Sequence, residues 1–244
     1  MRDHLADSEF ARTRRRLAPD QPAPGEPEVG ELPTSPYSEE ELGQVQKTGT
    51  TTVGLTTTDG VVLATDMRAS LAGRFVSNRD VQKVEQVHPT AALTMAGSVG
   101  GAQSFIRTLR AEADLYEARR QEDMTMTGLS TLAGNLLRGG PFFLVSPLLG
   151  GVDDSGEYVY SIDPAGGVMA DDYAVTGSGM QLAYGVLEQE YEDDLSNEAA
   201  SSVAARAVQS ATERDTASGD GIYLARITDE GVDIEGHKEF DELV

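Results

Sequence analysis

The alternation of apolar and polar residues changes character near residue 49. Residues 1–48 carry much of the chain's proline and many of its charges but no apolar periodicity. Such a segment cannot bury enough surface to offset the entropy of ordering. From residue 51 onward, apolar residues recur at the spacings of strands and helices. We therefore expect a disordered leader over residues 1–49, followed by one folded domain over residues 50–244.

Within the folded part, strand patterns and helix patterns alternate in groups. Alternating apolar residues on both sides of Asp59-Gly60 predict a hairpin over residues 51–66. Further strands are predicted at residues 91–97, 141–151, 158–162, 168–175, 222–227 and 232–234. Helices are predicted after the Ser98-Val99-Gly100-Gly101 break, with Ile106, Leu109, Ala113 and Tyr116 on one face, and at about residues 127–137, 181–191 and 197–212. Early and late strands with helix pairs between them predict an α+β layered sandwich of two sheets covered by helices.

The charge balance excludes several classes of partner. The formal net charge is −22 and the pI about 4.3. The folded part contains no basic cluster, so nucleic acid and anionic membrane surfaces are poor partners, and acidic substrates would be repelled. No apolar run approaches the roughly 20 residues that span a bilayer, which predicts a soluble, cytoplasmic protein.

The choice of charged and metal-binding residues narrows the chemistry further. Lysine occurs only at Lys47, Lys83 and Lys238, which with the abundant acids we interpret as adaptation to concentrated salt, because salt screens carboxylate repulsion. Cysteine is absent, which excludes disulfides, thiolate catalysis and thiolate metal sites. The histidines are isolated and favour neither a metal cluster nor a Ser-His-Asp triad; they are His4, His88 and His237. We expect no cofactor and no metal.

The step from Gly49 to Thr50 lies where the leader ends and the first strand begins. A hydroxyl is a weak nucleophile unless a base takes its proton, and a residue at a chain start carries its own amine, with a pKa of about 7.7 to 8.0. Gly49 has no Cβ and so permits a tight backbone that brings the threonine hydroxyl against the preceding carbonyl. Cleavage after Gly49 would therefore expose Thr50 as a possible nucleophile.

Five motifs, in this order along the chain, resemble those of archaeal proteasome β subunits of the haloarchaeal type, with the propeptide still attached. They are GTTTVGL, ATDMR, AGSVGGAQ, TGSG and RDTASGDG, and the resemblance extends from residue 49 to about residue 235. It implies a threonine endopeptidase of the N-terminal nucleophile class with a four-layer αββα sandwich and without a cofactor or catalytic metal. In that family, seven β subunits form each of two stacked inner rings. Rings of α subunits, which a regulatory ATPase engages, cover both ends, and unfolded cytosolic proteins are degraded inside.

The resemblance also implies roles for single residues. Thr50 matches the nucleophile, which is exposed when the Gly49–Thr50 bond is cut autocatalytically, and its freed amine would be the base. Asp66 matches the carboxylate that holds the catalytic lysine, and Lys83 matches that lysine after one inserted residue around residues 73–82. Because the chain has nearly abandoned lysine, the retention of Lys83 independently suggests that a compact ammonium is needed there. Gly97 matches the glycine whose N–H stabilises the oxyanion.

Two further groups of residues follow from the same resemblance. One group positions the N-terminus and the nucleophile and consists of Ser178, Asp215 and Ser218. The other lines the specificity pocket and consists of Ala69, Met95 and Val99. This pocket would be an uncharged apolar cavity for large hydrophobic side chains, which predicts chymotrypsin-like cleavage.

Two other functions remain open at this point. The first is a different N-terminal nucleophile hydrolase, such as an amidase or the simpler bacterial two-ring protease. The TGSG and RDTASG motifs argue against an amidase, and the long leader and closer motif match argue against the bacterial protease. The second is a noncatalytic subunit that only supplies scaffold to a ring. A scaffold subunit should have lost Thr50, Asp66 or Lys83, and all three are present.

Overall fold

The computed structural model describes residues 49–71, 73–140, 142 and 144–244, which lie within one compact unit of the chain. The predicted leader up to residue 48 lies outside the described residues, so its predicted disorder stays a prediction. None of the helices in the described ranges combines the length and the apolar character needed to cross a bilayer.

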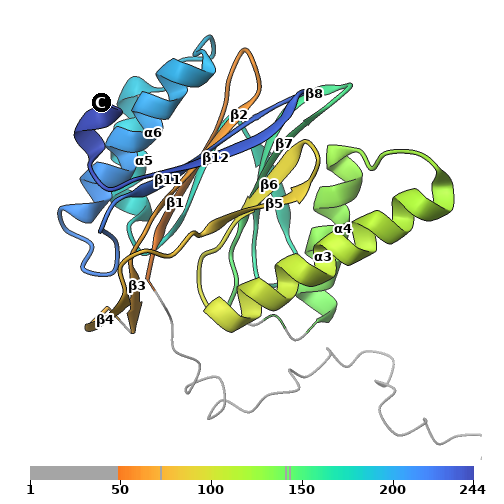
Figure 1. The fold of residues 1–244 in the computed structure, drawn as a ribbon, viewed down its shortest axis with the longest axis horizontal. Coiled ribbons are helices and arrows are strands. Elements are labelled where there is room, and N and C mark those ends of the chain that lie inside the picture. The colour runs from red at the N-terminus through yellow and green to blue at the C-terminus, as the bar shows by residue number, and fades with distance from the viewer. Residues whose placement is uncertain (1–48, 72, 141, 143) are drawn as a thin grey trace, which may run out of the picture. The chain divides into compact units, whose positions relative to one another are not determined.

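Two antiparallel five-stranded sheets form the centre of this unit (Figure 1). The first sheet has the order β10-β1-β2-β11-β12, made of Tyr173–Gly177, Thr51–Thr56, Val61–Asp66, Ile222–Thr228 and Gly231–His237. The second sheet has the order β5-β6-β7-β8-β9, made of Val84–His88, Ala91–Thr94, Leu148–Asp153, Gly156–Ile162 and Val168–Asp171. A separate two-stranded sheet consists of β3, Ala69–Leu71, and β4, Phe75–Asn78.

Helices cover the outer face of each sheet (Figure 1). On the second sheet lie α3, Val99–Arg120, and α4, Met126–Gly139. On the first sheet lie α5, Met180–Glu190, and α6, Asn197–Thr212, and a short 3-10 helix, η1, Phe240–Glu242, follows β12. The order helix pair, sheet, sheet, helix pair is a four-layer αββα sandwich, and it confirms the predicted fold class.

Each of the three interfaces between layers has its own apolar core. The largest buried side chains include Phe105, Leu109 and Leu129 under α3 and α4, Leu63 and Leu148 between the sheets, and Leu55 and Leu187 under α5 and α6. Because β1 and β2 are buried on both faces, they form rigid supports for any residue at their ends.

Helix α6 illustrates how the sequence brings a helix close to a sheet. Its N-terminus is capped by Ser196, whose hydroxyl accepts a hydrogen bond from the Ala199 N–H at 3.3 Å. Its buried face is dominated by small side chains, among them Ala200, Ala204, Ala207 and Ala211. These let α6 lie close over β1 and β2, and its C-terminus leads into residues 213–221, which reach the ends of both strands.

The structure confirms most predicted elements but corrects two predicted strands. The predicted strand at residues 141–151 begins only at Leu148. Before it, Leu144 has a left-handed φ of 55°, Val145 makes an isolated bridge to Gly97, and Pro147 has no N–H to donate to a ladder.

The predicted strand at residues 168–175 is two strands in two sheets. Strand β9 ends at Asp171 and β10 begins at Tyr173, so the chain crosses from one sheet to the other at Asp172. Apolar alternation continues through this corner, and a pattern alone therefore cannot locate it. The β3–β4 hairpin and β5 were not predicted from the sequence.

Glycines allow the two sheets to approach each other closely. A Cβ at Gly150 would lie 2.8 Å from Val61 Cγ1 and 2.9 Å from Leu63 Cδ2. A Cβ at Gly54, on the facing sheet, would lie 3.1 Å from Val159 Cγ1 in β8 of the second sheet. Side chains larger than hydrogen at these two positions would force the layers apart or distort their neighbours.

We expect Gly150→Ala to lower the free energy of unfolding by about 1–3 kcal/mol, because the new methyl group must displace packed side chains between the sheets. The matched control is Gly185→Ala on α5, where nothing lies within 4 Å of the added carbon. There, alanine's better helix propensity should raise the free energy by up to about 1 kcal/mol. Chemical denaturation at constant salt measures both, and equal effects would contradict the close approach of the sheets.

Candidate active site

Thr50 lies directly before β1, beside the end of β10 and the loop that follows it, and it is 2% exposed. Its carbonyl oxygen accepts a hydrogen bond from the Gly179 N–H at 3.4 Å and lies 3.3 Å from the Ser178 hydroxyl oxygen. Gly177 has a φ of 99°, and a Cβ there would lie 2.1 Å from the same oxygen. Only glycine therefore lets the end of β10 approach Thr50 this closely.

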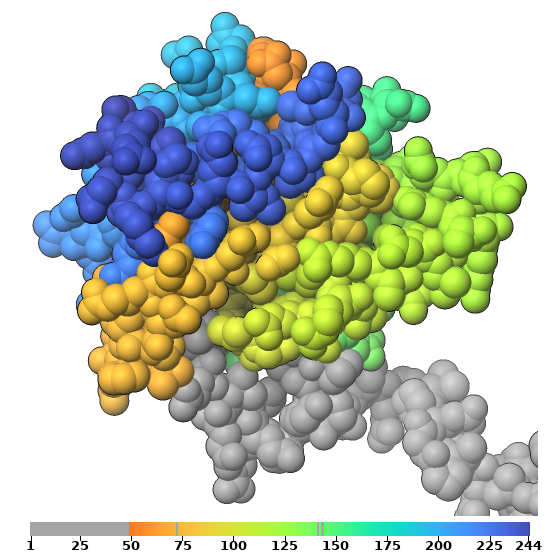
Figure 2. Space-filling view, in the orientation of Figure 1, coloured from red at the N-terminus to blue at the C-terminus, as the bar shows by residue number. Residues whose placement is uncertain are grey.

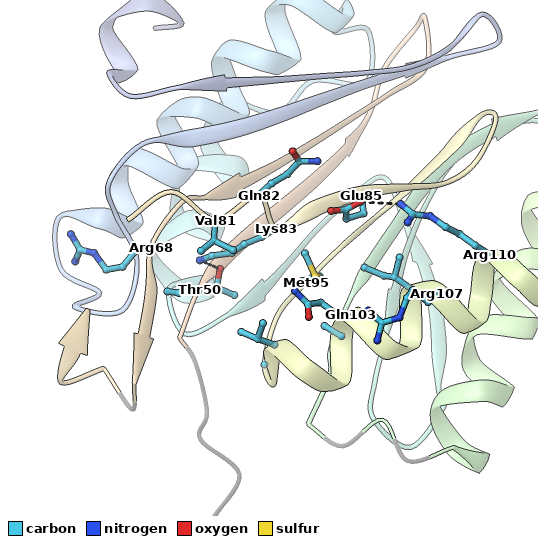
Figure 3. A pocket seen from close by; sticks show the side chains of 15 residues that line it. Thr50, Arg68, Val81, Gln82, Lys83, Glu85, Met95, Gln103, Arg107 and Arg110 are labelled. Atoms are coloured by element: carbon cyan, nitrogen blue, oxygen red, sulfur yellow. Dashed lines mark hydrogen bonds and ion pairs between the residues drawn. The ribbon is translucent and has the colours of Figure 1, made fainter. Parts of the chain in front are cut away.

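Asp66 and Lys83 meet at the Thr50 hydroxyl. The Lys83 Nζ donates to Thr50 Oγ1 at 2.6 Å and to Asp66 Oδ1 at 2.7 Å, and Thr50 Oγ1 donates to the same carboxylate oxygen at 2.7 Å. Figure 3 shows the Lys83 side chain pointing at Thr50. Asp66 ends β2 in the first sheet, whereas Lys83 directly precedes β5 in the second. The buried ion pair therefore joins the two sheets, and the insertion before Lys83 does not keep it away from Thr50.

Asp66 is held by hydrogen bonds on both carboxylate oxygens. Oδ1 also accepts from the Thr51 N–H at 3.0 Å, and Oδ2 accepts from the N–H groups of Arg68 at 3.0 Å and Gly219 at 2.9 Å. These donors fix the orientation of a fully buried carboxylate. Burial lowers the pKa of the Lys83 ammonium below its ordinary value, and the charge of Asp66 opposes that shift.

The predicted supporting group gathers on the other side of Thr50. The Thr50 N–H donates to Ser178 Oγ at 3.1 Å, and Ser178 Oγ donates to Asp215 Oδ2 at 2.5 Å. Ser218 Oγ donates to the same Asp215 oxygen at 2.7 Å and lies 2.8 Å from Thr51 Oγ1. The structure thus brings all three side chains into one network that ends at the Thr50 nitrogen.

Two glycines near the site, Gly49 and Gly97, stand where a Cβ would collide with neighbouring atoms. A Cβ at Gly49 would lie 2.0 Å from Ala217 Cβ and 2.7 Å from Ser178 Oγ, so no larger residue fits there without displacement. Gly97 has a φ of 108°, and a Cβ there would lie 1.7 Å from the Leu144 carbonyl oxygen. The left-handed turn at Gly97 follows β6 and brings the Gly97 backbone to the wall of the cavity described next.

A cavity of about 360 Å³ opens beside Thr50, a size typical of small-ligand pockets. Thr50, Lys83 and Gly97 contribute to its lining. All three residues predicted for a specificity pocket also line it, namely Ala69, Met95 and Val99. In Figure 3, Met95 lies between the Thr50 end of the lining and the residues that α3 contributes.

The cavity is not uncharged, and this part of the prediction is wrong. Its lining includes Arg68, Glu85, Arg107 and Arg110 in addition to Lys83. The side chains of Glu85, Arg107 and Arg110 lie outside the motifs from which the site was predicted. Residues 3 and 4 apart on one helix share a face, so α3 brings charged side chains to the cavity together with its apolar ones.

An ion-pair cluster that was not predicted from the sequence adjoins the site through Arg68. Arg68 Nε donates to Asp220 Oδ2 at 2.7 Å and Arg68 Nη1 donates to the Thr216 carbonyl at 3.1 Å, while Arg79 Nη1 donates to Asp220 Oδ1 at 3.0 Å. Burial alone would raise the pKa of the Asp220 carboxyl, but the two arginines outweigh it and lower that pKa. Asp220 has a φ of 66°, a left-handed conformation that aspartate adopts more readily than most residues. Two features of the sequence could have indicated this cluster: Asp220 stands between two glycines in SGDG, and Arg68 ends the ATDMR motif.

Among the residues that the structure describes, no three His, Asp or Glu side chains are grouped so that they could hold a metal ion. The polar side chains around Thr50 are instead hydrogen-bonded to one another and to backbone N–H groups.

Comparison with known proteins gives a consistent family. The family described as proteasome subunit matches residues 46–227. The chain is 68% identical over 244 residues to a proteasome subunit beta of Natrialba magadii, with 100% of both chains covered. It is 65% identical over 244 residues to a proteasome subunit beta 1 of Haloterrigena turkmenica, again with 100% of both covered. It is 63% identical over 237 residues to a proteasome subunit beta of Halobacterium salinarum, with 97% of each covered.

We expect Asp66→Asn to lower the free energy of unfolding by about 3–5 kcal/mol, because it leaves the buried Lys83 ammonium without its countercharge. The double variant Asp66→Asn/Lys83→Met removes both charges and should lose less than Asp66→Asn alone. Denaturant titration of the full chain at constant salt measures the coupling. If the loss in the double variant equals the sum of the losses in Asp66→Asn and in Lys83→Met, the two charges are not coupled and the prediction is contradicted.

Proposed function

The chain belongs to the proteasome subunit family, and from this premise we propose that it is a catalytic β subunit, a threonine endopeptidase with Thr50 as its nucleophile. As a member of that family, it assembles with other subunits into a proteasome complex. The observation that carries the catalytic proposal is the contact of the Thr50 hydroxyl with Lys83 Nζ at 2.6 Å and Asp66 Oδ1 at 2.7 Å. A scaffold subunit has no need of a buried lysine aimed at a buried hydroxyl.

The nucleophile becomes complete only when the leader is removed. In the uncut chain the Thr50 nitrogen belongs to an amide, which cannot act as a base at neutral pH. We propose that Thr50 Oγ1 attacks the Gly49 carbonyl, that the carbon–nitrogen bond breaks as the acyl group moves to oxygen and the hydroxyl proton passes to the leaving Thr50 nitrogen, and that water hydrolyses the ester. The freed amine then occupies the position from which the Thr50 nitrogen now donates to Ser178 Oγ at 3.1 Å.

The freed amine supplies the base for peptide hydrolysis. It takes the hydroxyl proton as Oγ1 bonds to the substrate carbonyl carbon, and Lys83 beside it lowers its pKa by charge repulsion. The backbone N–H of Gly97 is the proposed donor to the oxyanion. When the carbon–nitrogen bond breaks, the proton passes to the leaving nitrogen. Water, activated by the same amine, hydrolyses the ester and restores the Thr50 hydroxyl.

Ser178 and Asp215 position that amine. Because Ser178 gives its own proton to Asp215, its oxygen accepts a hydrogen bond from the Thr50 nitrogen. This directs the amine's lone pair away from Ser178 and leaves it available to the hydroxyl. Ser218 holds Asp215 from the other side at 2.7 Å, which makes it a positioning residue in the same network.

The cavity supports cleavage after large apolar residues. Ala69, Met95 and Val99 present apolar surface near Thr50, and the volume of about 360 Å³ accommodates a bulky side chain. We propose chymotrypsin-like cleavage of unfolded cytosolic proteins inside a chamber of stacked seven-membered β rings, under α-subunit rings that a regulatory ATPase engages. Residues 1–49 are proposed as the propeptide that blocks Thr50 until assembly.

Thr50 substitutions test the nucleophile. In protein coexpressed with its α subunit in high salt, wild type should begin at Thr50 and cleave a fluorogenic peptide that ends in a bulky apolar residue. Thr50→Ala should keep its leader and lose at least about a thousandfold in kcat, as expected when a nucleophile is removed. Thr50→Ser, which keeps the hydroxyl, is the matched control and should remain processed and active. Assembled rings that keep the leader and lack activity in the wild type would favour the scaffold function.

The pH dependence tests the base. Activity should rise as pH increases through the amine's pKa, because only the neutral amine accepts a proton, and Lys83 should hold that midpoint below about 7.7. At higher pH, Lys83 loses its charge, and because burial lowers its pKa, activity should fall again below about pH 10.4. A kcat/KM profile at constant salt measures both limbs. A profile that stays flat from pH 5 to pH 10 would contradict an amine base.

A further inference from the structure

Lys83 reaches Thr50 from the end of a segment without regular secondary structure. Residues 79–82, the connecting segment, follow β4 of the two-stranded sheet and lead toward β5 of the second sheet (Figure 1). They fall in the range, residues 73–82, to which the resemblance assigns one inserted residue. A connecting segment has no strand ladder to fix its backbone, so other contacts must set the position of Lys83.

The first two side chains of the connecting segment contact partners of opposite charge. Arg79 Nη1 lies 3.0 Å from Asp220 Oδ1, and Asp80 Oδ1 lies 3.0 Å from Lys238 Nζ and accepts a hydrogen bond from Tyr223 at 3.2 Å. The hydrogen bond from Lys238 lowers the pKa of the Asp80 carboxyl, which therefore stays ionised. Figure 2 shows the gold surface of this part of the chain bordering the blue surface of the C-terminal residues. Two neighbouring residues of opposite charge thus face two partners of opposite charge.

Both partners are tied to residues that adjoin the buried carboxylate of Asp66. Asp220 follows Gly219, whose N–H donates to Asp66 Oδ2 at 2.9 Å. Lys238 Nζ donates to the sulfur of Met67, the residue after Asp66, at 3.3 Å. The two ion pairs therefore connect the segment that leads to Lys83 with the two segments that hold its countercharge.

The head group of Lys238 suits this position better than that of arginine. Its nitrogen lies 3.0 Å from Asp80 Oδ1, 3.3 Å from Met67 Sδ and 3.4 Å from the Arg79 carbonyl oxygen. An ammonium has three N–H donors around one atom, whereas a guanidinium directs its donors within one plane. Lysine occurs only three times in the chain. The retention of Lys238, like that of Lys83, indicates that a compact cation is needed.

Given the proposed function, we propose that Arg79 and Asp80 are positioning residues for peptide hydrolysis, because their two ion pairs keep Lys83 at the Thr50 hydroxyl. Both side chains are exposed, and exposed ion pairs are individually weak. The pairs therefore act on the alignment of Lys83 more than on the stability of the fold. The compact ammonium of Lys238 is the partner that completes this arrangement.

The alignment of Lys83 sets the pKa of the freed Thr50 amine. Asp66, Arg68 and Asp215 also carry charge near the site, but they belong to other segments, so a disturbed connecting segment moves Lys83 relative to them. If Lys83 withdraws, the pKa of the amine rises toward about 7.7, and the acid limb of the pH profile moves up with it. For charges about 4 Å apart at an effective dielectric constant of about 20, a retreat of about 1 Å corresponds to roughly half a pKa unit.

The test exchanges the two charges of the connecting segment in the variant Arg79→Asp/Asp80→Arg. This exchange keeps the composition and the net charge but sets like charges against Asp220 and Lys238. The processed, assembled protein is assayed at constant high salt on a fluorogenic peptide that ends in a bulky apolar residue. At pH 7, kcat/KM should fall about fivefold, the loss expected for two exposed pairs, and the acid midpoint should rise by about half a unit.

A third substitution separates the ion pair from general effects. Lys238→Asp should lower kcat/KM about twofold in the wild-type background, where the new carboxylate opposes Asp80. In the exchanged background it faces a cation and should raise kcat/KM instead. Arg226→Asp is the matched control, because it makes the same change of charge in the same β11–β12 hairpin at a side chain that bonds to Ser201 and Glu235. It should leave the acid midpoint of each background unchanged.

The outcomes distinguish this inference from the proposed function. If Lys238→Asp acts in the same direction in both backgrounds, or if the acid midpoint stays at the wild-type value in the exchanged variant, the positioning role is overturned and the endopeptidase proposal stands. If the exchanged chain keeps its leader, adding Lys238→Asp should restore a chain that begins at Thr50, and failure to do so overturns the role as well. If the wild type cleaves no peptide, the proposed function fails, and this inference fails with it.

Discussion

The buried ion pair of Lys83 and Asp66 is the interaction on which the site depends. It joins two sheets that otherwise contact each other through apolar side chains, and both of its members contact the Thr50 hydroxyl within 2.7 Å. Burying two charges is costly unless every remaining donor and acceptor is matched. Asp66 meets that condition with N–H groups from three separate parts of the chain. The stability of the layered fold and the alignment of the proposed nucleophile therefore rest on the same atoms.

Backbone geometry supports this arrangement from the outside. Gly49, Gly97 and Gly177 each stand where a Cβ would meet another atom at 2.1 Å or less. The close approaches bring main-chain groups, rather than long side chains, to the Thr50 carbonyl and the wall of the cavity. Main-chain groups in packed elements lose little further freedom when a substrate binds, which is the form of preorganisation that stabilises a developing charge.

Charge is distributed differently at the surface and at the site. The chain as a whole carries −22, a value that concentrated salt tolerates because the repulsion between carboxylates is screened. The site collects cations instead, and all but Arg107 are paired within hydrogen-bond distance. Contacts at hydrogen-bond distance are shorter than the screening length even in molar salt, so they persist where long-range steering does not. Direct pairing is therefore the electrostatic mechanism available to such a protein.

The sequence by itself determined the layered α+β class, the hairpin that carries Thr50 and Asp66, and, through the resemblance, the residues around Thr50. These succeed because apolar period and turn residues are local, and because Asp66 ends the strand paired with the one that Thr50 precedes. Only the tertiary structure decided that Lys83 reaches across from the other sheet, that residues 168–175 divide between two sheets, and that arginines line the cavity. Each of these depends on which distant segments pack together. Periodicity says which face of an element is buried but not which partner buries it.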